Sequence, residues 1–298
     1  MIRRPLDPVD APPRSTFDAQ SMPDLGPENP LVSRILDGLR VAVVIVLVAL
    51  VALVGIPLQW LALALKLPFR RTLPTLFHRI VLALIGVRVS VEGAPAAGRP
   101  LLLLSNHSSW LDILVVGTLA PLFFVAKAEV SGWPVIGLMA RLQRTVFVDR
   151  ERRHATGTVN QEIAARLRDG DPVVLFAEGT SSDGNRVLPF RSALVGAVRE
   201  AFATSGTVIV QPVSVAYVGL QGIPMGRAHR PVAAWCGDLD LAPHLFEVLR
   251  QGAIDVKVVF GAARELDGDH DRKLVTRACE DEVRALTEAS LTGRPPEA

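Results

Sequence analysis

One segment limits what this chain can fold into. From Val41 to Leu65 it is apolar apart from Gln59, Gly55 and Pro57. As a helix this run would be about 37 Å long, because each residue adds ~1.5 Å. The hydrocarbon core of a bilayer is ~30 Å thick, so the run is long enough to cross it. The run lies too deep in the chain for a cleaved signal peptide. The sequence therefore predicts a membrane-associated helix.

The flanks of this segment leave two membrane arrangements open. Pro57 removes a backbone donor and favours a kink near Ile56. Basic residues occur on both sides, so their distribution gives no orientation; they are Arg34, Arg40, Lys66, Arg70, Arg71 and Arg79. The segment either spans the bilayer or lies as a bent helix in one leaflet. A second stretch, Leu73–Ile85, is predicted to be an interfacial helix with His78 and Arg79 near lipid phosphates.

The rest of the chain divides on either side of these helices. Residues 1–30 are rich in proline and acidic residues and have little periodic apolar pattern, which is typical of a disordered tail. Residues 31–86 hold the predicted membrane-associated helices. From residue 87 to 298, short apolar strands alternate with helices. This alternation predicts an α/β domain with a mixed β-sheet flanked by helices. Cys236 and Cys279 are too far apart for a metal motif or a disulfide framework, which suits a reducing compartment.

The turn after the predicted strand Pro100–Ser105 carries a candidate acid–base pair. The segment Asn106–Asp112 reads N-H-S-S-W-L-D. Histidine is the side chain best suited to take a proton near neutral pH, and a carboxylate can hold its second ring nitrogen. Residues five apart in one helix point to different faces, but at a strand-to-helix turn they can meet. With Ser109 as the N-cap and Asp112 in the first turn, His107 would lie just before the helix.

Two segments and a set of basic residues follow this turn in the chain and could contact a substrate. The segment Phe176–Asp183 reads F-A-E-G-T-S-S-D, in which Glu178 can accept a hydrogen bond from a substrate hydroxyl and Gly179 lets the backbone approach a ligand. The strand Val208–Val213 is interrupted by Pro212 and so forms a pocket wall or a sheet edge. Basic residues that can receive an anionic head group are Lys127, Arg144 and Arg150, whereas Arg152 and Arg153 are interpreted as a solvated face.

Together these segments resemble the glycerolipid acyltransferase family, typified by 1-acylglycerol-3-phosphate acyltransferase. That family carries N-H-x-x-x-x-D, then F-V-A-K-x-E with a later D-R, then F-P-E-G-T-R-S, then a strand with proline. Matching segments occur here in this order between Leu101 and Val218, with Phe124–Glu129 and Asp149–Arg150 as the second block. The resemblance implies an acyl thioester donor, on acyl carrier protein or coenzyme A, and a membrane lysolipid acceptor.

The same resemblance assigns residues to the reaction. It implies His107 as the general base and Asp112 as its partner, with no covalent acyl-enzyme, no cofactor beyond the donor and no metal. Residues in its substrate-binding blocks are Lys127, Arg150, Glu178, Gly179 and Thr180. Because the donor is made in the cytoplasm, the resemblance also implies a cytoplasmic membrane protein whose catalytic domain faces the cytoplasm.

One departure from the family pattern concerns the acceptor. Where the family has F-P-E-G-T-R, this chain has F-A-E-G-T-S, so Ser181 replaces an arginine associated with the acceptor phosphate. Either Arg186 or Arg191 supplies the missing charge, or the acceptor has no phosphate. Lyso-ornithine lipid fits the second case, because it has a free hydroxyl on its 3-hydroxyacyl chain and a zwitterionic head group. The sequence leaves the two acceptors open.

Two other functions are less well supported. A lipid or thioester hydrolase of the serine class needs a G-x-S-x-G elbow, which this sequence lacks. A non-catalytic lipid-binding membrane protein would have no need of both His107 and Asp112. Nucleic acid is excluded as a partner, because the net charge is only +2 and there is no binding motif or long basic stripe. The sequence therefore predicts a lysolipid O-acyltransferase of membrane lipid biosynthesis.

Overall fold

The computed structural model describes residues 30–148, 155–192, 206–237, 239–267 and 270–294. The predicted disordered tail, residues 1–30, lies outside this part of the chain except for Pro30, which begins a helix. The predicted Arg150 contact also lies outside the described residues.

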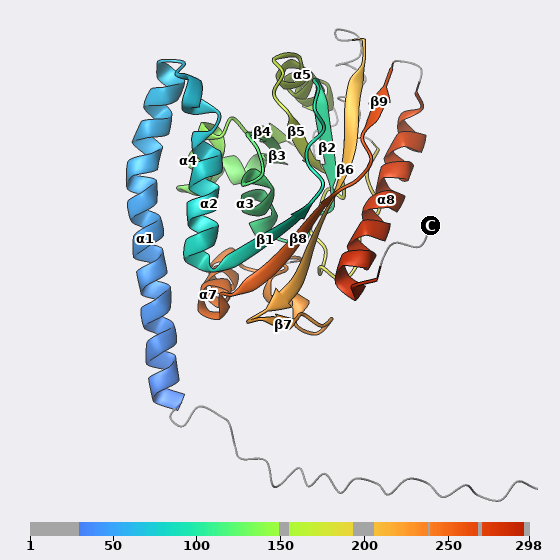
Figure 1. Cartoon of the computed structure of the whole chain (residues 1–298). Helices are drawn as coiled ribbons and strands as arrows, with labels where there is room; N and C mark the ends of the chain where they lie inside the picture. The colour runs from blue at the N-terminus through green and yellow to red at the C-terminus, as the bar shows by residue number, and fades with distance from the viewer. Residues whose placement is uncertain (1–29, 149–154, 193–205, 238, 268–269, 295–298) are drawn as a thin grey trace, which may run out of the picture.

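A mixed sheet forms the centre of the molecule (Figure 1). Its strands follow the order β1-β8-β6-β2-β5-β3-β4, with β7 and β9 pairing with the ends of the long strand β6. The strand β6 runs parallel to β2 and antiparallel to β8. The strands are β1 (Val87–Glu92), β2 (Leu101–Ser105), β3 (Phe123–Lys127), β4 (Val146–Val148), β5 (Val173–Phe176), β6 (Val208–Leu220), β7 (Ile223–Pro224), β8 (Ile254–Phe260) and β9 (Arg264–Leu266).

Helices cover both faces of this sheet. They are α1 (Pro30–Ala64), α2 (Leu73–Ile85), α3 (Leu111–Gly117), α4 (Ile136–Leu142), α5 (Ala155–Arg168), α7 (Leu241–Gln251) and α8 (Arg272–Thr292), with the short 3₁₀ turns η1 (Pro68–Arg70), η2 (Ala128–Gly132) and η4 (Arg230–Val232). Along β2, Leu101 and Leu103 pack with α1, α2, α3 and α7, while Leu102 and Leu104 pack with α5 and α8. This alternation follows the two-residue period of a strand, and burial on both faces explains why β2 is apolar throughout. The predicted α/β fold is therefore confirmed.

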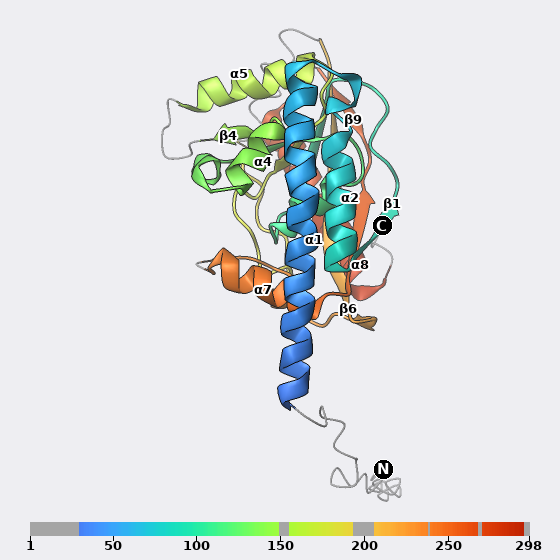
Figure 2. The same cartoon turned by 90° about the vertical axis from the view of Figure 1, so that its left-hand side faces the viewer.

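The long apolar run forms most of α1, which continues without a break through Pro57. Figures 1 and 2 show α1 lying along one side of the domain, with its first turns extending beyond it. Two of its polar side chains, Gln59 and Asp37, contact the domain. Gln59 Nε2 donates to the carbonyls of Arg70 at 2.9 Å and Leu142 at 3.0 Å, and Asp37 pairs with Arg250 of α7 at 3.3 Å. These contacts fix α1 against the domain.

The second predicted membrane helix has the bounds that the sequence indicated, but one of its basic residues points elsewhere. His78 is buried against α3, and a Cβ placed on Gly117 would clash with its ring. Arg79 Nε donates to the carbonyl of Thr118 at 2.9 Å. The prediction that His78 meets lipid phosphates is therefore wrong, because α2 uses this face to pack on α3.

Arg144 likewise has a structural position that differs from the head-group contact suggested by the sequence. It pairs with the buried Asp171 at 3.1 Å and lies over the ring of Phe123. Arg71, which follows η1, reaches the same carboxylate at 2.8 Å. A buried carboxylate needs such partners because desolvation penalises its charge. This cluster ties the N-terminal helices to the sheet.

Candidate active site

The turn that leaves β2 brings His107 and Asp112 together, as the sequence predicted. His107 Nδ1 lies 2.8 Å from Asp112 Oδ2. The Asp112 side chain is 0% exposed, whereas that of His107 is 20% exposed. The carboxylate therefore holds one ring nitrogen from inside the protein, and the other nitrogen remains for a substrate.

Several donors hold the carboxylate of Asp112. Besides His107, Oδ2 accepts hydrogen bonds from the backbone N–H groups of Ser108 at 2.7 Å and Ser109 at 2.9 Å. The hydroxyl of Tyr217 donates to Oδ1 at 2.6 Å. These bonds replace the water that a buried carboxylate loses, and they hold the carboxylate in one position.

The start of α3 explains the local geometry. Asp112 lies in the first turn, and its carboxylate reaches back to the backbone N–H groups of Ser108 and Ser109, which precede the helix. The sequence predicted Ser109 as the N-cap, but the helix begins one residue later, with Trp110 as the N-cap. The Ser109 hydroxyl instead accepts a hydrogen bond from the backbone N–H of Leu111 at 3.3 Å. The same carboxylate thus fixes the turn before the helix and orients the histidine.

Asn106 anchors this turn to the neighbouring strand β6. Its side-chain amide donates to the carbonyl of Val215 at 2.9 Å and its oxygen accepts the Val215 N–H at 2.8 Å. Tyr217 is two residues further along β6 and therefore on the same face of the sheet, next to Asp112. The strand β6 thus fixes both ends of the turn from Asn106 to Asp112.

Tyr217 is a site residue that sequence reasoning missed. Its one sequence signal is that it is the sole tyrosine of the chain, in a long apolar strand. Burial and the adjacent Asp112 charge raise the pKa of its hydroxyl well above the usual value. The hydroxyl therefore keeps its proton and acts as a permanent donor to the carboxylate.

Glu178 borders His107 on the other side. The ring of Phe176, the last residue of β5, stacks on the imidazole with 4.2 Å between centroids. Two residues later, Glu178 Oε1 accepts a hydrogen bond from the His107 backbone N–H at 3.2 Å. Glu178 is 1% exposed, and this burial raises its pKa to about 8. The side chain is therefore mostly neutral at pH 7 and can donate a hydrogen bond through its carboxyl proton.

The loop after Glu178 packs on the histidine turn. Gly179 has a positive φ of 73°, a conformation that favours glycine. The backbone N–H of Ser182 donates to the carbonyl of His107 at 2.8 Å. Thr180 is exposed and Ser181, which stands in place of the family's arginine, is half-buried. The predicted segment Glu178–Thr180 therefore adjoins the His107 turn.

Three of the basic residues that the sequence predicted as substrate contacts lie at exposed positions outside the His107–Asp112 turn. Lys127 ends β3, and because β2, β3 and β5 are parallel it shares the carboxyl edge of the sheet with His107 and Glu178. Lys127, Arg186 and Arg191 are all exposed. Within the described part of the chain, none of their side chains makes a hydrogen bond or ion pair with the His107–Asp112 pair. Their roles in substrate binding stay predictions.

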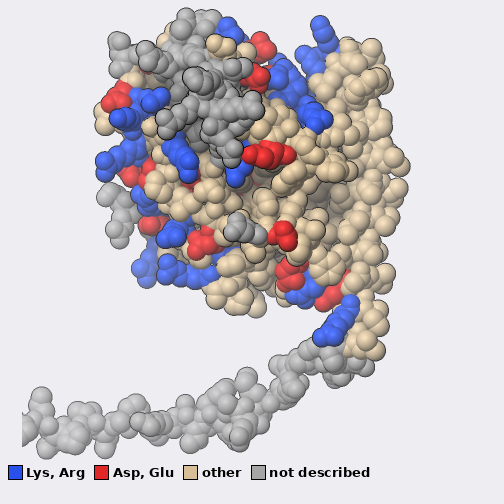
Figure 3. Space-filling model, turned by 180° about the vertical axis from the view of Figure 1, so that it is seen from behind, with Lys and Arg blue, Asp and Glu red and all other residues tan. Residues whose placement is uncertain are grey.

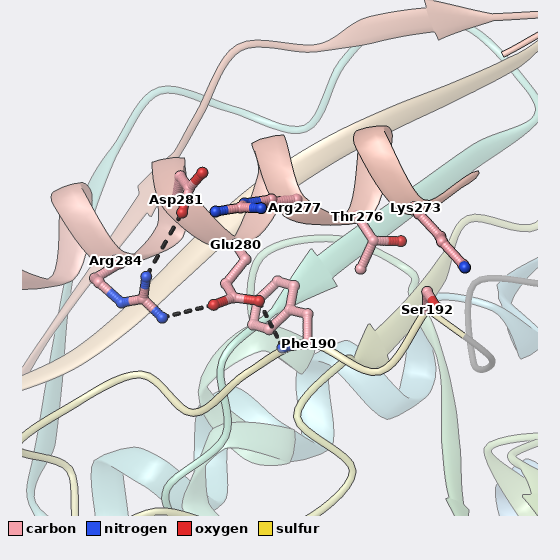
Figure 4. Close-up of a pocket in the computed structure, with 8 residues that line it drawn as sticks. All are labelled: Phe190, Ser192, Lys273, Thr276, Arg277, Glu280, Asp281 and Arg284. Atoms are coloured by element: carbon pink, nitrogen blue, oxygen red, sulfur yellow. Dashed lines mark hydrogen bonds and ion pairs between the residues drawn. The ribbon is translucent and has the colours of Figure 1, made fainter. Parts of the chain in front are cut away.

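A separate hollow lies between α8 and the end of the loop that follows β5 (Figure 4). Glu280 closes one side of it, accepting the Phe190 N–H at 2.9 Å and pairing with Arg284 at 2.6 Å. Its lining residues are Phe190, Ser192, Lys273, Thr276, Arg277, Glu280, Asp281 and Arg284. None of these residues belongs to the turn that carries His107, so this hollow is distinct from the candidate active site.

Comparison with known proteins agrees with this site. Residues 87–216 match the family model described as Acyltransferase. The chain is 49% identical to the lyso-ornithine lipid O-acyltransferase of Brucella abortus (strain 2308), covering 87% of this chain and 98% of that protein. The protein of the same name from Rhizobium meliloti (strain 1021) is 49% identical, with 86% and 88% covered. A 1-acyl-sn-glycerol-3-phosphate acyltransferase of Neisseria gonorrhoeae is 31% identical, with 68% and 77% covered.

The fold also has a solved counterpart. The crystal structure of the 1-acyl-sn-glycerophosphate (LPA) acyltransferase PlsC from Thermotoga maritima superposes with a TM-score of 0.62 at 20% identity. The match covers 89% of this chain and 100% of that one.

The site places a buried carboxylate against a histidine at the carboxyl edge of a mixed α/β sheet, an arrangement that suits general-base chemistry. The matched segment and the long alignments show that the chain belongs to the acyltransferase family and is an enzyme of lipid metabolism. The family resemblance predicted from the four motifs is confirmed. The relatives named above are acyltransferases, which favours acyl transfer over hydrolysis or lipid binding alone.

Proposed function

We propose that this enzyme is a lysolipid O-acyltransferase whose acceptor is lyso-ornithine lipid and whose donor is an acyl thioester of acyl carrier protein or coenzyme A. The observation that carries the reaction type is the 2.8 Å contact between His107 Nδ1 and the buried Asp112 carboxylate. Two relatives that are 49% identical over most of their length carry this acceptor in their name. Ser181, in place of the family's arginine, supports an acceptor without a phosphate.

The reaction begins with proton transfer to His107. Its Nδ1–H donates to Asp112, so Nε2 can take the proton of the acceptor hydroxyl as the oxygen attacks the thioester carbonyl carbon. The new C–O bond gives a tetrahedral oxyanion. Its collapse breaks the C–S bond, and the leaving sulfur takes the proton back from His107. During the transfer, the Asp112 carboxylate stabilises the imidazolium that forms.

We also propose that α1 lies in one leaflet of the cytoplasmic membrane, with the catalytic domain facing the cytoplasm where the donor is made. By length and composition α1 is able to cross a bilayer. However, α2, α4 and α7 pack against α1, and a simple span would draw these helices into the hydrocarbon with it. The side of the molecule formed by α1 is almost free of charge in Figure 3, and Lys and Arg side chains gather on the opposite side.

Exposed apolar side chains give α1 a surface that suits an interfacial position. On α1 they include Leu39, Val43, Val46, Leu50, Leu53, Val54 and Trp60, and the neighbouring helices α2 and α7 add Leu76, Ile80 and Phe246. This placement would hold the active site at the interface, so that neither the acceptor nor the product has to be extracted into water.

An acceptor panel tests the reaction and the acceptor. The purified enzyme would be given an acyl thioester with lyso-ornithine lipid, with lysophosphatidic acid or with no acceptor, while thiol release is measured. We expect thiol release that depends on lyso-ornithine lipid. Release of free fatty acid without any acceptor would instead indicate a hydrolase, and a preference for lysophosphatidic acid would overturn the proposed acceptor.

Labelling of single cysteines tests the membrane arrangement. Leu36 and Leu65 are exposed near opposite ends of α1, and a background without Cys236 and Cys279 would receive one cysteine at either position. In sealed inside-out vesicles, a membrane-impermeant maleimide should label both variants if α1 lies in one leaflet. Labelling at Leu65→Cys alone would indicate a span.

A further inference from the structure

Arg230 is a buried cation without a counter-ion among the residues that the structure describes. It begins η4 and is only 6% exposed. One guanidinium nitrogen donates to Asn185 Oδ1 at 2.6 Å, but Nε has no hydrogen-bond partner in the described ranges. No described carboxylate lies within ion-pair distance of this side chain. Buried arginines are normally paired, so this group is poised for an anion from outside the chain.

The surroundings of Arg230 also favour an added anion. Burial, and then the neighbouring Arg227 charge, lower the pKa of Arg230, while Asp183 acts in the opposite direction. An anionic ligand would offset this destabilisation of the charged form, because it would pair with the desolvated guanidinium. The planar guanidinium matches a carboxylate in two parallel hydrogen bonds.

Arg230 lies beside the catalytic turn. A Cβ placed on Gly184 would lie 3.8 Å from the Arg230 Cβ and 3.9 Å from the Cβ of Ser108, the residue after His107. The backbone N–H of Trp235, five residues after Arg230, donates to the carbonyl of Ser108 at 2.7 Å. A ligand held by Arg230 would therefore border the residues that carry the general base.

A negative group accompanies this cation. Asp183 is half-buried, and its carboxylate accepts hydrogen bonds from the Asn185 backbone N–H at 3.1 Å and from the Asn185 side-chain amide at 3.3 Å. Asn185 thus bridges the carboxylate of Asp183 and the guanidinium of Arg230. The two charged groups do not neutralise each other directly, which leaves one anionic and one cationic position next to the active site.

We propose that Arg230 binds the carboxylate and Asp183 the ammonium group of a zwitterionic, amino-acid-type lipid head group, with Asn185 holding the two charges apart. The inference rests on the proposed acceptor and names the groups that recognise it. Ornithine bears one carboxylate and one free ammonium group when its other nitrogen is acylated. In this chain the anion-binding arginine would thus come from η4, whereas position 181 of the E-G-T-x block is a serine.

A change in the acceptor tests this inference in the unaltered enzyme. Lyso-ornithine lipid would be compared with the same lipid in which the head-group carboxylate is a primary amide. Loss of one charged hydrogen-bonded pair should raise KM for the amide roughly ten- to a hundredfold. Equal KM values for the two lipids would overturn the assignment of Arg230. No transfer to lyso-ornithine lipid at all would overturn the proposed acceptor instead.

Variants then locate the contact. Arg230→Gln should raise KM for the native lipid and remove the discrimination between carboxylate and amide. Arg227→Gln is the matched control, because it removes an equal charge from an exposed neighbouring position. Discrimination that persists in Arg230→Gln would contradict the proposal, since a residue that only supports the fold would not change the preference between two head groups.

A separate experiment tests the proposed contact between Asp183 and the ammonium group. Acetylation of the free head-group amine should raise KM in the unaltered enzyme, and Asp183→Asn should make the acetylated and native lipids equivalent. If Asp183→Asn still discriminates against the acetylated lipid, Asp183 does not bind the ammonium group.

Discussion

Two sides of His107 differ in how their buried polar groups are satisfied. On the Asp112 side, the carboxylate accepts hydrogen bonds from two backbone N–H groups, the imidazole and Tyr217. On the other side, Glu178 Oε2 and Arg230 Nε are buried and have no hydrogen-bond partner among the described residues. Unpaired buried polar atoms cost stability, and a ligand bound beside His107 would supply partners for these two. The protein alone thus holds the Asp112 carboxylate, whereas the proposed acceptor would complete the hydrogen bonds of Glu178 and Arg230.

Loss of the imidazole should have the largest effect on activity. His107→Ala removes the proposed general base, and general-base catalysis contributes roughly 10²–10⁴-fold. We expect kcat to fall by about that factor in the acceptor-dependent thiol-release assay. The matched control is His270→Ala, which breaks a histidine–carboxylate contact of 2.7 Å with Asp267 at an exposed position. Unchanged acyl transfer in His107→Ala would refute the proposed mechanism.

Tyr217→Phe should have a smaller effect on activity than loss of His107. The Asp112 carboxylate would lose the hydrogen bond that Tyr217 donates to Oδ1 at 2.6 Å, so the carboxylate would be held less firmly beside His107. We expect kcat to fall about tenfold while KM for the acceptor stays unchanged, because a hydrogen bond to a charged group contributes roughly 1.5–3 kcal/mol. Initial rates over a range of acceptor concentrations measure both constants. An unchanged kcat would show that Tyr217 only supports packing.

Burial of Glu178 should make the stability of the folded protein depend on pH. Its pKa in the folded protein is about 8, raised by burial from 4.5. Between these values the folded state binds more protons than the unfolded state, so stability falls as pH rises from about 4.5 to about 8. Glu178→Gln has no such proton to lose. Its stability in denaturant titrations should decline less over this range, and a decline equal to that of the unaltered protein would show that Glu178 is already ionised.

The smallest effects are expected at the exposed arginines. If the acceptor lacks a phosphate, Arg186→Gln and Arg191→Gln should change KM for lyso-ornithine lipid less than twofold, since neither side chain contacts the His107 turn within the described residues. Initial rates over a range of acceptor concentrations give this KM. A large increase in KM for either variant would indicate that this arginine binds the head group. It would also count against the proposed contact between Arg230 and the head-group carboxylate.

The sequence alone predicted the features that depend on neighbours in the chain. The apolar run that starts at Val41 forms most of α1, and the alternation of strands and helices gave the mixed α/β sheet. The pairing of His107 with Asp112 could also be predicted, because a strand-to-helix turn brings together residues only five positions apart. Local periodicity and turn chemistry are sufficient for such contacts.

Only the tertiary structure decided the partners that come from distant segments. Tyr217 is 105 positions from Asp112, and Arg230 is 45 positions from Asn185. These contacts depend on which strands are neighbours and in what register, and local periodicity does not encode strand order. His78 was misplaced for the same reason, since the face that α2 buries depends on where α3 packs. The sequence thus determined the His107–Asp112 contact, and the fold determined what surrounds it, because the surrounding groups meet only when the sheet assembles.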